Sequence, residues 1–408
     1  MSLRARAIPA ARRAAAMVRG WRHERLVRSF VRAGTGRAGR LPRGVVYEAT
    51  MRCNLRCRFC YVGDLLNREG EWHEELDLGT LQRVFPERPG LQVSLTGGEV
   101  FVRRDALDVL DLFRRKGYRC GYLTTNGTLI DEERANALAA LARTGFLKHI
   151  SVSIDGPKDL HDAARGVTGT FERTAAGLSR LRQAARRVSA PLRVTINTTV
   201  SREVLGALDR MVDVASELGV DAIGLNHLMF STPGEVDETA RLTGAPDRSA
   251  IATCVTDDPG LTPAAVRRQV AALRDRCRER NIRFDHRPKV TDALIDAYYT
   301  PGAPLAGRCL YPFLHARVSF SGKAYFCPFI RIEVGDLTRS PLEEIWSGRP
   351  YVDLRRRLLE QGLFPVCRRC CKVELSPEPI PASDIQLQRR KMIALRPVAG
   401  PGAPLSIG

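Results

Sequence analysis

The stretch "VVYEATMRCNLRCRFC" (residues 45–60) joins a short apolar run to a loop that holds three closely spaced cysteines. The run at 45–49 predicts a buried β-strand. Cys53, Cys57 and Cys60 follow directly, with a C-x3-C-x2-C spacing. Thiolates bind soft metals such as zinc, copper(I) or iron–sulfur clusters. A structural zinc site needs four ligands, and no fourth lies nearby. The spacing therefore favours an iron–sulfur cluster held by three thiolates, with one coordination position left open.

Five further β-rich runs follow this first strand, and amphipathic helical stretches lie between successive runs. The runs are residues 91–95, 120–125, 149–154, 193–200 and 221–228; the helical stretches include 106–117, 132–145, 170–187 and 204–219. Strands that alternate with helices and are nearly continuous in apolar residues predict a parallel sheet. Six such units predict an α/β fold, either an open doubly wound sheet or an incomplete barrel.

Polar residues stand at the carboxyl end of each predicted strand. After the cysteine loop these are "TGGE" (96–99), "TNGT" (125–128), Ser153 with "DGP" (155–157), Asn197, and Asn226 with His227. In parallel barrels, ligands gather at the carboxyl ends of the strands. The pattern therefore predicts one site at the top of a barrel.

The cysteine spacing, with Phe59 and Tyr61 around the last cysteine and "TGGE" downstream, resembles the radical S-adenosylmethionine (SAM) superfamily. The resemblance covers residues of about 45–230. It implies a partial (β/α)6 TIM-like barrel in which Cys53, Cys57 and Cys60 hold a [4Fe–4S] cluster. SAM would chelate the fourth iron through its amino and carboxylate groups. Reductive cleavage of SAM would then give methionine and a 5′-deoxyadenosyl radical that abstracts a hydrogen atom from the substrate.

The resemblance also implies which residues contact SAM. Gly97, Gly98 and Glu99 match the family's GGE motif, in which the glycines would let the backbone approach the ligand and the glutamate would take the SAM ammonium. "SVSIDGP…HDAARG" resembles the peptide-modifying and sulfatase-maturing members. The remaining candidate contacts are Asn126, Ser153, Arg165 and Asn197. Val100 stands where relatives usually have proline, which should alter the loop without removing a ligand.

A second cysteine group begins at residue 309. Cys309 is followed by Gly322-x4-Cys327 and then by Cys367-x2-Cys370, with Cys371 adjacent. This pattern resembles the C-terminal SPASM/Twitch extension, which binds auxiliary clusters. A full SPASM domain carries seven cysteines for two clusters, so the five here imply one auxiliary [4Fe–4S] cluster on Cys309, Cys327, Cys367 and Cys370. Cys371 could substitute for Cys370, and a structural zinc site on the same four residues is the alternative.

These features predict an enzyme that oxidises or crosslinks its substrate with help from the auxiliary cluster. The family acts on ribosomally made peptides, on sulfatases, and on sugars or cyclitols, so the substrate is either a peptide or a sugar/cyclitol-type natural-product intermediate. A reductase or a flavodoxin-type protein is the expected electron donor. Acid or base candidates are His227, Asp257 and His286. Of the remaining thiols, Cys120, Cys254 and Cys277 stand apart from both groups and are interpreted as plain buried cysteines.

The chain divides into five expected parts: a basic arm (1–44), the barrel (45–235), a connecting segment (236–305), the cysteine-rich domain (306–376) and a Pro/Gly-rich tail (377–408). The net charge is +19, and the arm alone has 12 arginines against one acid, Glu24. The arm could contact an anionic membrane surface or an acidic partner, or be a solvated extension. The body is only mildly basic, so we expect no specific nucleic acid. With no apolar span and no signal peptide, a cytoplasmic location is expected.

A different class of function would use the same residues without SAM. In it, the cysteines bind zinc and the basic arm binds nucleic acid or serves as a membrane-surface partner. That interpretation leaves "TGGE" and the alternation of strands and helices unexplained.

Overall fold

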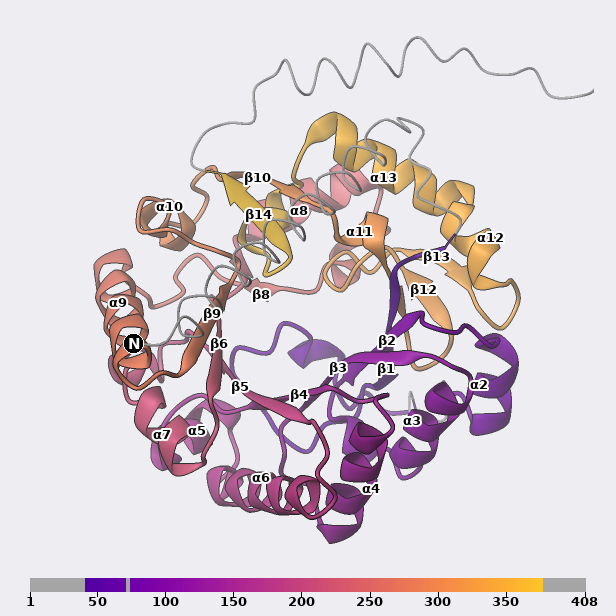
Figure 1. Cartoon of the computed structure of the whole chain (residues 1–408). Coiled ribbons are helices and arrows are strands. Elements are labelled where there is room, and N and C mark those ends of the chain that lie inside the picture. The colour runs from indigo at the N-terminus through magenta and orange to yellow at the C-terminus, as the bar shows by residue number, and fades with distance from the viewer. Residues whose placement is uncertain (1–40, 71–73, 377–408) are drawn as a thin grey trace, which may run out of the picture.

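The computed structural model describes residues 41–70 and 74–376, and six parallel strands form the wall of a barrel within them (Figure 1). These strands are β1 (Gly44–Thr50), β2 (Gln92–Gly97), β3 (Arg119–Thr125), β4 (His149–Ser153), β5 (Arg193–Thr199) and β6 (Ala222–Asn226). Each pairs in parallel with the next. The helices lie outside the ring, as in a barrel and unlike a doubly wound sheet. The predicted partial barrel is therefore confirmed, while the basic arm and the tail lie almost entirely outside the described residues.

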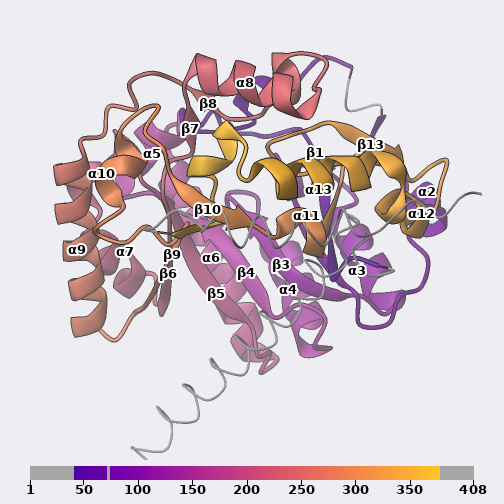
Figure 2. The ribbon, with the colours of Figure 1, turned by 90° about the horizontal axis from the view of Figure 1, so that it is seen from above.

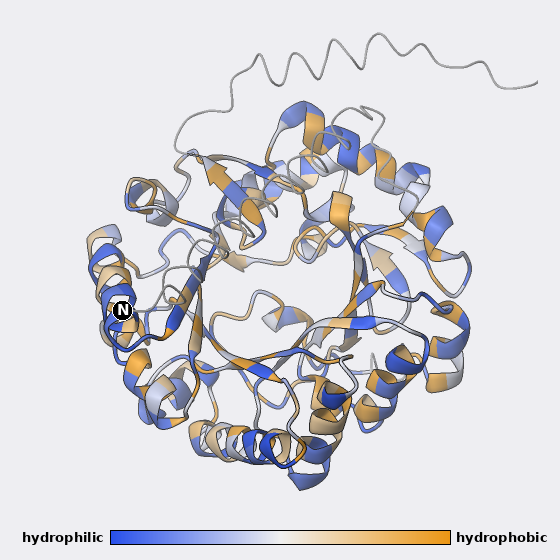
Figure 3. Ribbon diagram, viewed as in Figure 1, coloured by the Kyte–Doolittle hydropathy of each residue, from blue (hydrophilic) through white to orange (hydrophobic). Residues whose placement is uncertain are grey.

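The outer helices alternate with these strands. They are α2 (Leu78–Val84), α3 (Ala106–Arg115), α4 (Glu132–Arg143), α5 (Lys158–Arg165), α6 (Thr170–Arg187) and α7 (Met211–Glu217). Hydrophilic and hydrophobic residues alternate along them (Figure 3), because each buries one face against the sheet. Val109 and Phe113 of α3 and Leu181 of α6 belong to this buried layer. The predicted helix at 204–219 is divided into a short 3-10 turn (Leu205–Ala207) and α7.

The sheet continues beyond the six predicted strands on both sides. β9 (Arg283–Arg287) pairs in parallel with β6, and β11 (His315–Val318) pairs in parallel with β1. β12 (Lys323–Tyr325) and β13 (Glu333–Asp336) follow as antiparallel strands. The segment expected to be a connection thus supplies a wall strand. Its sequence, RFDHR, did not indicate a strand because charged residues face the lumen at every second position.

The C-terminal elements lie in the gap of the ring between β9 and β13, against one side of the barrel (Figures 1 and 2). They include β10 (Ala306–Cys309), β14 (Val373–Ser376), α11 (Tyr311–Leu314), α12 (Leu342–Ser347), α13 (Arg349–Gln361) and the 3-10 helix η6 (Pro365–Arg369). The segment before them forms β7 (Phe230–Ser231), α8 (Pro233–Thr243), β8 (Cys254–Val255), α9 (Pro263–Glu279) and α10 (Ile295–Tyr299). Every helix in the described ranges is too short or too polar to cross a bilayer.

A buried arginine fixes the cysteine-bearing end of the chain to this frame. Arg369 of η6 is 1% exposed and donates 2.9 Å to Glu235 of α8 and 2.7 Å to the carbonyl of Tyr298 in α10. A buried guanidinium needs such partners because an unpaired buried charge is very costly. The loop that carries Cys367 and Cys370 is therefore held by two elements of the connecting segment.

Candidate active site and cysteine centres

A single cavity of about 880 Å³ occupies the barrel lumen and collects most of the residues predicted to act. Its lining includes Cys53, Cys57, Cys60, Gly97, Gly98, Glu99, Asn126, Ser153, Arg165, Asn197 and His227. Two of the three acid–base candidates lie elsewhere: Asp257 is exposed, and His286 contacts His227 without lining the cavity. The carboxyl ends of the strands do gather into one site.

The end of α5 contacts the cysteine loop (residues 53–60) and supports it. The backbone N–H of Arg56 donates 3.0 Å to the carbonyl of Arg165, and Arg165 donates 3.5 Å to the Sγ of Cys57. Gly166, at φ +70°, ends α5 in the left-handed region. A Cβ there would lie 2.5 Å from the carbonyl oxygen of Arg56. The HDAARG segment therefore supports the loop as well as lining the cavity.

Gly97 and Gly98 lie against the root of the same loop. The N–H of Gly98 donates 2.8 Å to the carbonyl of Thr50, and a Cβ on Gly97 would overlap that carbonyl oxygen. A Cβ on Gly98 would likewise overlap the carbonyl oxygen of Arg52. These glycines thus allow a close approach between two backbones, and their approach to a ligand stays a prediction.

Glu99 is buried at the centre of a polar network. Its Oε2 accepts 2.6 Å from the N–H of Asn126, and its Oε1 accepts 2.7 Å from the hydroxyl of Thr125 and 3.2 Å from the N–H of Phe101. Burial raises the pKa of Glu99, and these donors oppose the rise. Because each carboxylate oxygen can accept two hydrogen bonds, Oε2 keeps capacity for one cationic donor from the cavity.

The side chain of Asn126 ties the third strand end to the cysteine loop. Its amide donates 2.9 Å to Oδ1 of Asn54, and its own Oδ1 accepts from Thr128. On the far side, Ser153 of β4 is paired in register with Asn197 of β5. Asn226 of β6 donates 3.0 Å to the Oδ1 of Asn197. The strand ends therefore form a hydrogen-bonded polar rim.

Arg165 forms a buried ion pair that points it into the site. Its Nη2 lies 2.5 Å from Oδ2 of Asp155, which is fully buried and whose other oxygen accepts 2.8 Å from the N–H of Thr199. Burial raises the pKa of Asp155, and Arg165 opposes that rise. The Nε of Arg165 is buried and has no partner among the described residues. This unsatisfied donor in the lining is suited to an anionic group of a ligand.

Four cysteines of the second group come together behind the lumen. Cys309 ends β10, Cys327 follows β12, and Cys367 and Cys370 lie in and after η6. Burial raises the pKa of Cys309 to about 12 and that of the other three as well, and the Cys309, Cys327 and Cys367 thiols contribute to these shifts.

Two of these sulfurs already accept backbone hydrogen bonds. The N–H of Ile330 donates 3.2 Å to Cys327, and the N–H of Lys372 donates 3.3 Å to Cys370. Such donors stabilise cluster-bound thiolates.

Cys371 differs from its four neighbours because it lines the barrel cavity and they do not. Its N–H donates 3.3 Å to the Sδ of Met229. The hydrogen bond from Cys370, followed by the charges of Lys372 and Arg287, outweighs burial and lowers the pKa of Cys371 to about 6. The second group therefore touches the lumen through this one residue.

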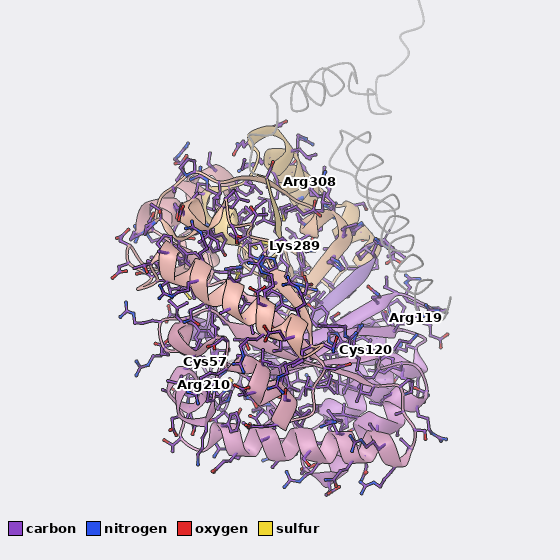
Figure 4. All side chains as sticks on the ribbon, turned by 60° about the vertical axis from the view of Figure 1, so that its left-hand side comes forward. Cys57, Arg119, Cys120, Arg210, Lys289 and Arg308 are labelled. Carbon is purple, nitrogen blue, oxygen red and sulfur yellow. The ribbon has the colours of Figure 1, made fainter. Side chains whose placement is uncertain are left out.

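Figure 4 marks Cys57, which lines the cavity, and Cys120, which is buried in the wall on β3 and belongs to neither group.

His227 and His286, two of the acid–base candidates, are in contact. Nε2 of His227 lies 3.3 Å from Nδ1 of His286, and Nδ1 of His227 lies 2.7 Å from the hydroxyl of Tyr299. Burial, with a contribution from His286, lowers the pKa of His227 to about 3. His227 is therefore neutral at physiological pH, and both its ring nitrogens have protein partners.

Several cavity residues could not be singled out from the sequence. Arg317 of β11 reaches the lumen and pairs at 2.6 Å with Glu48 of β1, which also binds Arg331. Arg287 of β9 and Lys372 also line the lumen. The only sequence signal was a charged residue inside an otherwise apolar strand, as with Glu48, or at every second position, as in β9.

Comparisons with known proteins agree with this geometry. The family model described as "Radical SAM superfamily" matches residues 47–205, and the model described as "Iron-sulfur cluster-binding domain" (SPASM) matches residues 309–371. Together they cover more than half of the chain.

Similar curated proteins include the AdoMet-dependent heme synthase of Methanosarcina barkeri, 28% identical over 318 residues (75% of this chain and 82% of that protein). The PqqA peptide cyclase of Streptomyces rochei is 29% identical over 315 residues, 75% of each chain. Among solved structures, Streptococcus suis SuiB bound to S-adenosylmethionine superposes with a TM-score of 0.53 at 19% identity. That match covers 85% of this chain and 77% of SuiB. Native anSMEcpe with bound AdoMet and Cp18Cys peptide gives 0.52 at 15% identity, covering 86% of this chain and 95% of that chain.

Proposed function

Because the chain belongs to the radical SAM superfamily and carries a SPASM iron–sulfur domain, we propose that it oxidises a substrate held in the barrel lumen between two cysteine centres. The observation that carries this proposal is the cavity itself. One continuous space is lined by Cys53, Cys57 and Cys60 on one side and by Cys371 of the second group on another. A substrate in it would be within reach of both centres.

The family's cofactors are SAM and [4Fe–4S] clusters, and the residues present fit them. Cys53, Cys57 and Cys60 would hold the cluster that binds SAM, and Cys309, Cys327, Cys367 and Cys370 would hold one auxiliary cluster. When bound, these groups supply the radical that takes a hydrogen atom from substrate carbon and an acceptor for the second electron.

The chain's own residues would place SAM and exclude water. The unsatisfied Nε–H of Arg165 suits the SAM carboxylate, and the spare acceptor capacity of Glu99 suits its ammonium. Ser153, Asn126 and Asn197 complete a polar rim for the ribose. Asp155 keeps Arg165 oriented. The strands surround the lumen on several sides, so a bound substrate would shield a reactive intermediate from part of the solvent.

A peptide is the substrate we propose first. The chain resembles a PqqA peptide cyclase over three quarters of its length, and the fold matches a SuiB structure bound to the precursor peptide SuiA. At about 880 Å³ the cavity is near the upper end of the ~300–1,000 Å³ range of ligand pockets. It therefore has room for SAM and one or two peptide side chains. A reductase or flavodoxin-type protein would donate the electron.

A tetrapyrrole is the second candidate. Three curated relatives at 26–28% identity over about three quarters of the chain are AdoMet-dependent heme synthases. Their similarity is as extensive as that of the peptide cyclase. The sugar or cyclitol alternative has no counterpart among the relatives named here.

The proposal is tested by anaerobic reconstitution, iron analysis, and an assay for 5′-deoxyadenosine with dithionite and SAM. We expect about eight iron atoms per chain. Cys57→Ala should lose about four of them and all SAM cleavage, whereas Cys120→Ala, a buried thiol outside both groups, should retain both. A colourless zinc protein, or one with intact clusters that never cleaves SAM, would contradict the proposal.

A further inference from the structure

The lumen is lined by more positive than negative side chains. Six basic residues reach it against two acidic ones, Glu99 and Asp285. The basic residues are Arg165, Arg193, Arg283, Arg287, Arg317 and Lys372. A cavity with this excess of cations attracts anionic groups, because the summed charges give it a positive potential.

Three of these cations are already neutralised by carboxylates of the protein. Arg165 pairs with Asp155 at 2.5 Å, Arg317 with Glu48 at 2.6 Å, and Arg283 with Asp221 at 3.1 Å. Within residues 41–70 and 74–376, no ion pair is formed by Arg193, Arg287 or Lys372. Glu99 and Asp285 offset part of this charge, because the N–H of Asn126 that bonds Glu99 is neutral. Three such cations against two carboxylates still leave the lumen a surplus of positive charge.

Arg287 and Lys372 belong to one part of the lumen. Arg287 ends β9, beside Asn226 of β6, and its carbonyl accepts 2.9 Å from the N–H of His227. Lys372 follows Cys371 directly, and the N–H of Cys371 donates 3.3 Å to the Sδ of Met229, which lines the cavity two residues after His227. Tyr122 of β3 also lines the cavity. Arg193, by contrast, begins β5 and so lies at the opposite, amino end of the strands.

We propose that Arg287 and Lys372 bind a carboxylate of the substrate beside Cys371, so that the substrate of the proposed radical SAM reaction is an acidic molecule. This inference rests on the proposed function and adds the chemical class of the substrate. A guanidinium and an ammonium on either side of one carboxylate make charge-assisted hydrogen bonds, and Arg287 can do so through two N–H groups. The anchored end then lies near the auxiliary centre, and the rest of the substrate extends toward the SAM-binding cysteines.

Binding to the reconstituted holoenzyme tests this directly. One pair of probes is coproporphyrin III and its tetramethyl ester; the other is an acetylated, amidated Ala-Glu-Tyr-Glu-Ala peptide and its glutamine analogue. We expect at least one acid form to bind at least ~10-fold more tightly than its neutral partner. The Arg287→Gln/Lys372→Gln double variant should weaken acid binding by ~10–100-fold, which removes the difference between acid and neutral forms.

Arg210→Gln is the control for loss of a positive charge, because Arg210 is exposed before α7 and does not line the cavity. It should bind the acid probes as the wild type does. Arg287→Lys keeps the charge but not the paired donors. It should bind the acid probes more weakly than the wild type and more tightly than the double variant. Iron content and the visible absorption of the clusters identify any variant that has failed to fold.

Three results would overturn the proposal: neutral probes that bind as tightly as acids, a double variant that binds acids like the wild type, or no binding of either acid probe at about 1 mM. The preferred acid distinguishes a peptide from a tetrapyrrole. If the wild type does not cleave SAM, the proposed function is refuted. Failure of the acidic-substrate proposal can therefore be told apart from failure of the proposed function.

Discussion

The guanidinium of Arg165 donates a hydrogen bond to the Sγ of Cys57 across 3.5 Å. The same side chain forms a 2.5 Å ion pair with the fully buried Asp155. One cation thus connects the fourth strand end to the middle cysteine of the loop, although Arg165 and Cys57 are 108 residues apart in the sequence.

Replacing Arg165 with glutamine should therefore impair two properties together. Asp155 would be left as a buried carboxylate without its cation, and we expect the unfolding free energy to fall by about 3–5 kcal/mol. SAM affinity should fall by ~10–100-fold, because the donor assigned to its carboxylate is lost. Urea unfolding and equilibrium dialysis with labelled SAM measure the two effects.

The double variant Arg165→Gln/Asp155→Asn separates the two effects. It removes both charges, so stability should be partly restored while SAM affinity stays low. Recovery of SAM affinity with stability would show that Arg165 acts only through the fold.

Gly166→Ala should loosen the cysteine loop. The added Cβ would approach the carbonyl of Arg56 to 2.5 Å, at a φ of +70° that disfavours any side chain. Gly145→Ala is the matched control, because Gly145 has a similar φ of +79° but no atom within 4 Å of its Cβ position. Strain alone should cost both variants about 1 kcal/mol. Only Gly166→Ala should also lose iron from the SAM-binding cluster, measured by iron content and by EPR of the reduced protein. Equal iron loss in both would contradict the role given to Gly166.

The sequence was sufficient for the barrel but not for the contacts inside it. Strands β1 to β6 carry β-rich, largely apolar runs that alternate with helices, so a parallel sheet could be predicted. β9 could not, because Arg283, Asp285 and Arg287 face the lumen and no apolar run marks the strand. Its identity depends on pairing with β6, which is a tertiary property.

In the site, too, some features could be predicted from the sequence and others required the fold. The spacing of Cys53, Cys57 and Cys60 indicated their role directly, since ligands in one loop must be close. Asp155 appeared only as part of a turn, and its pairing with Arg165 required the fold. The approach of the "TGGE" glycines to SAM stays a prediction, whereas their contact with the backbone of Thr50 and Arg52 required the fold.

Glu48→Gln should destabilise the barrel where the C-terminal strands join it. Glu48 of β1 is fully buried and accepts from both Arg317 and Arg331. Its replacement would leave two buried cations without a counter-charge, so we expect a loss of about 3–5 kcal/mol in unfolding free energy by urea titration. Glu238→Gln, which removes the exposed partner of Arg241, should change stability little.

The stabilisation from Glu48 should also depend on pH. Burial alone would raise the pKa of Glu48, but Arg317 and Arg331 outweigh it and lower the pKa to about 2. A carboxyl group whose pKa is lower in the folded state stabilises the protein above its unfolded pKa of about 4.3. That stabilisation is lost as pH falls toward 2. In the apoprotein, the difference between wild type and Glu48→Gln should therefore be constant above about pH 5 and shrink below it. A difference that grows on acidification would contradict this assignment.

Cys370 and Cys371 should behave oppositely although they are adjacent. Cys370 is 7% exposed, accepts 3.3 Å from the N–H of Lys372, and interacts with the Cys309 and Cys367 thiols, whereas Cys371 lines the lumen. We expect Cys370→Ala to lose about four iron atoms per chain and Cys371→Ala to retain them. Because Cys371 lies beside the proposed carboxylate site, its replacement should instead alter substrate turnover while the EPR signal of the auxiliary cluster persists. If Cys371→Ala loses the iron and Cys370→Ala keeps it, the ligand assignment is reversed, and the cluster then binds through the residue that faces the substrate.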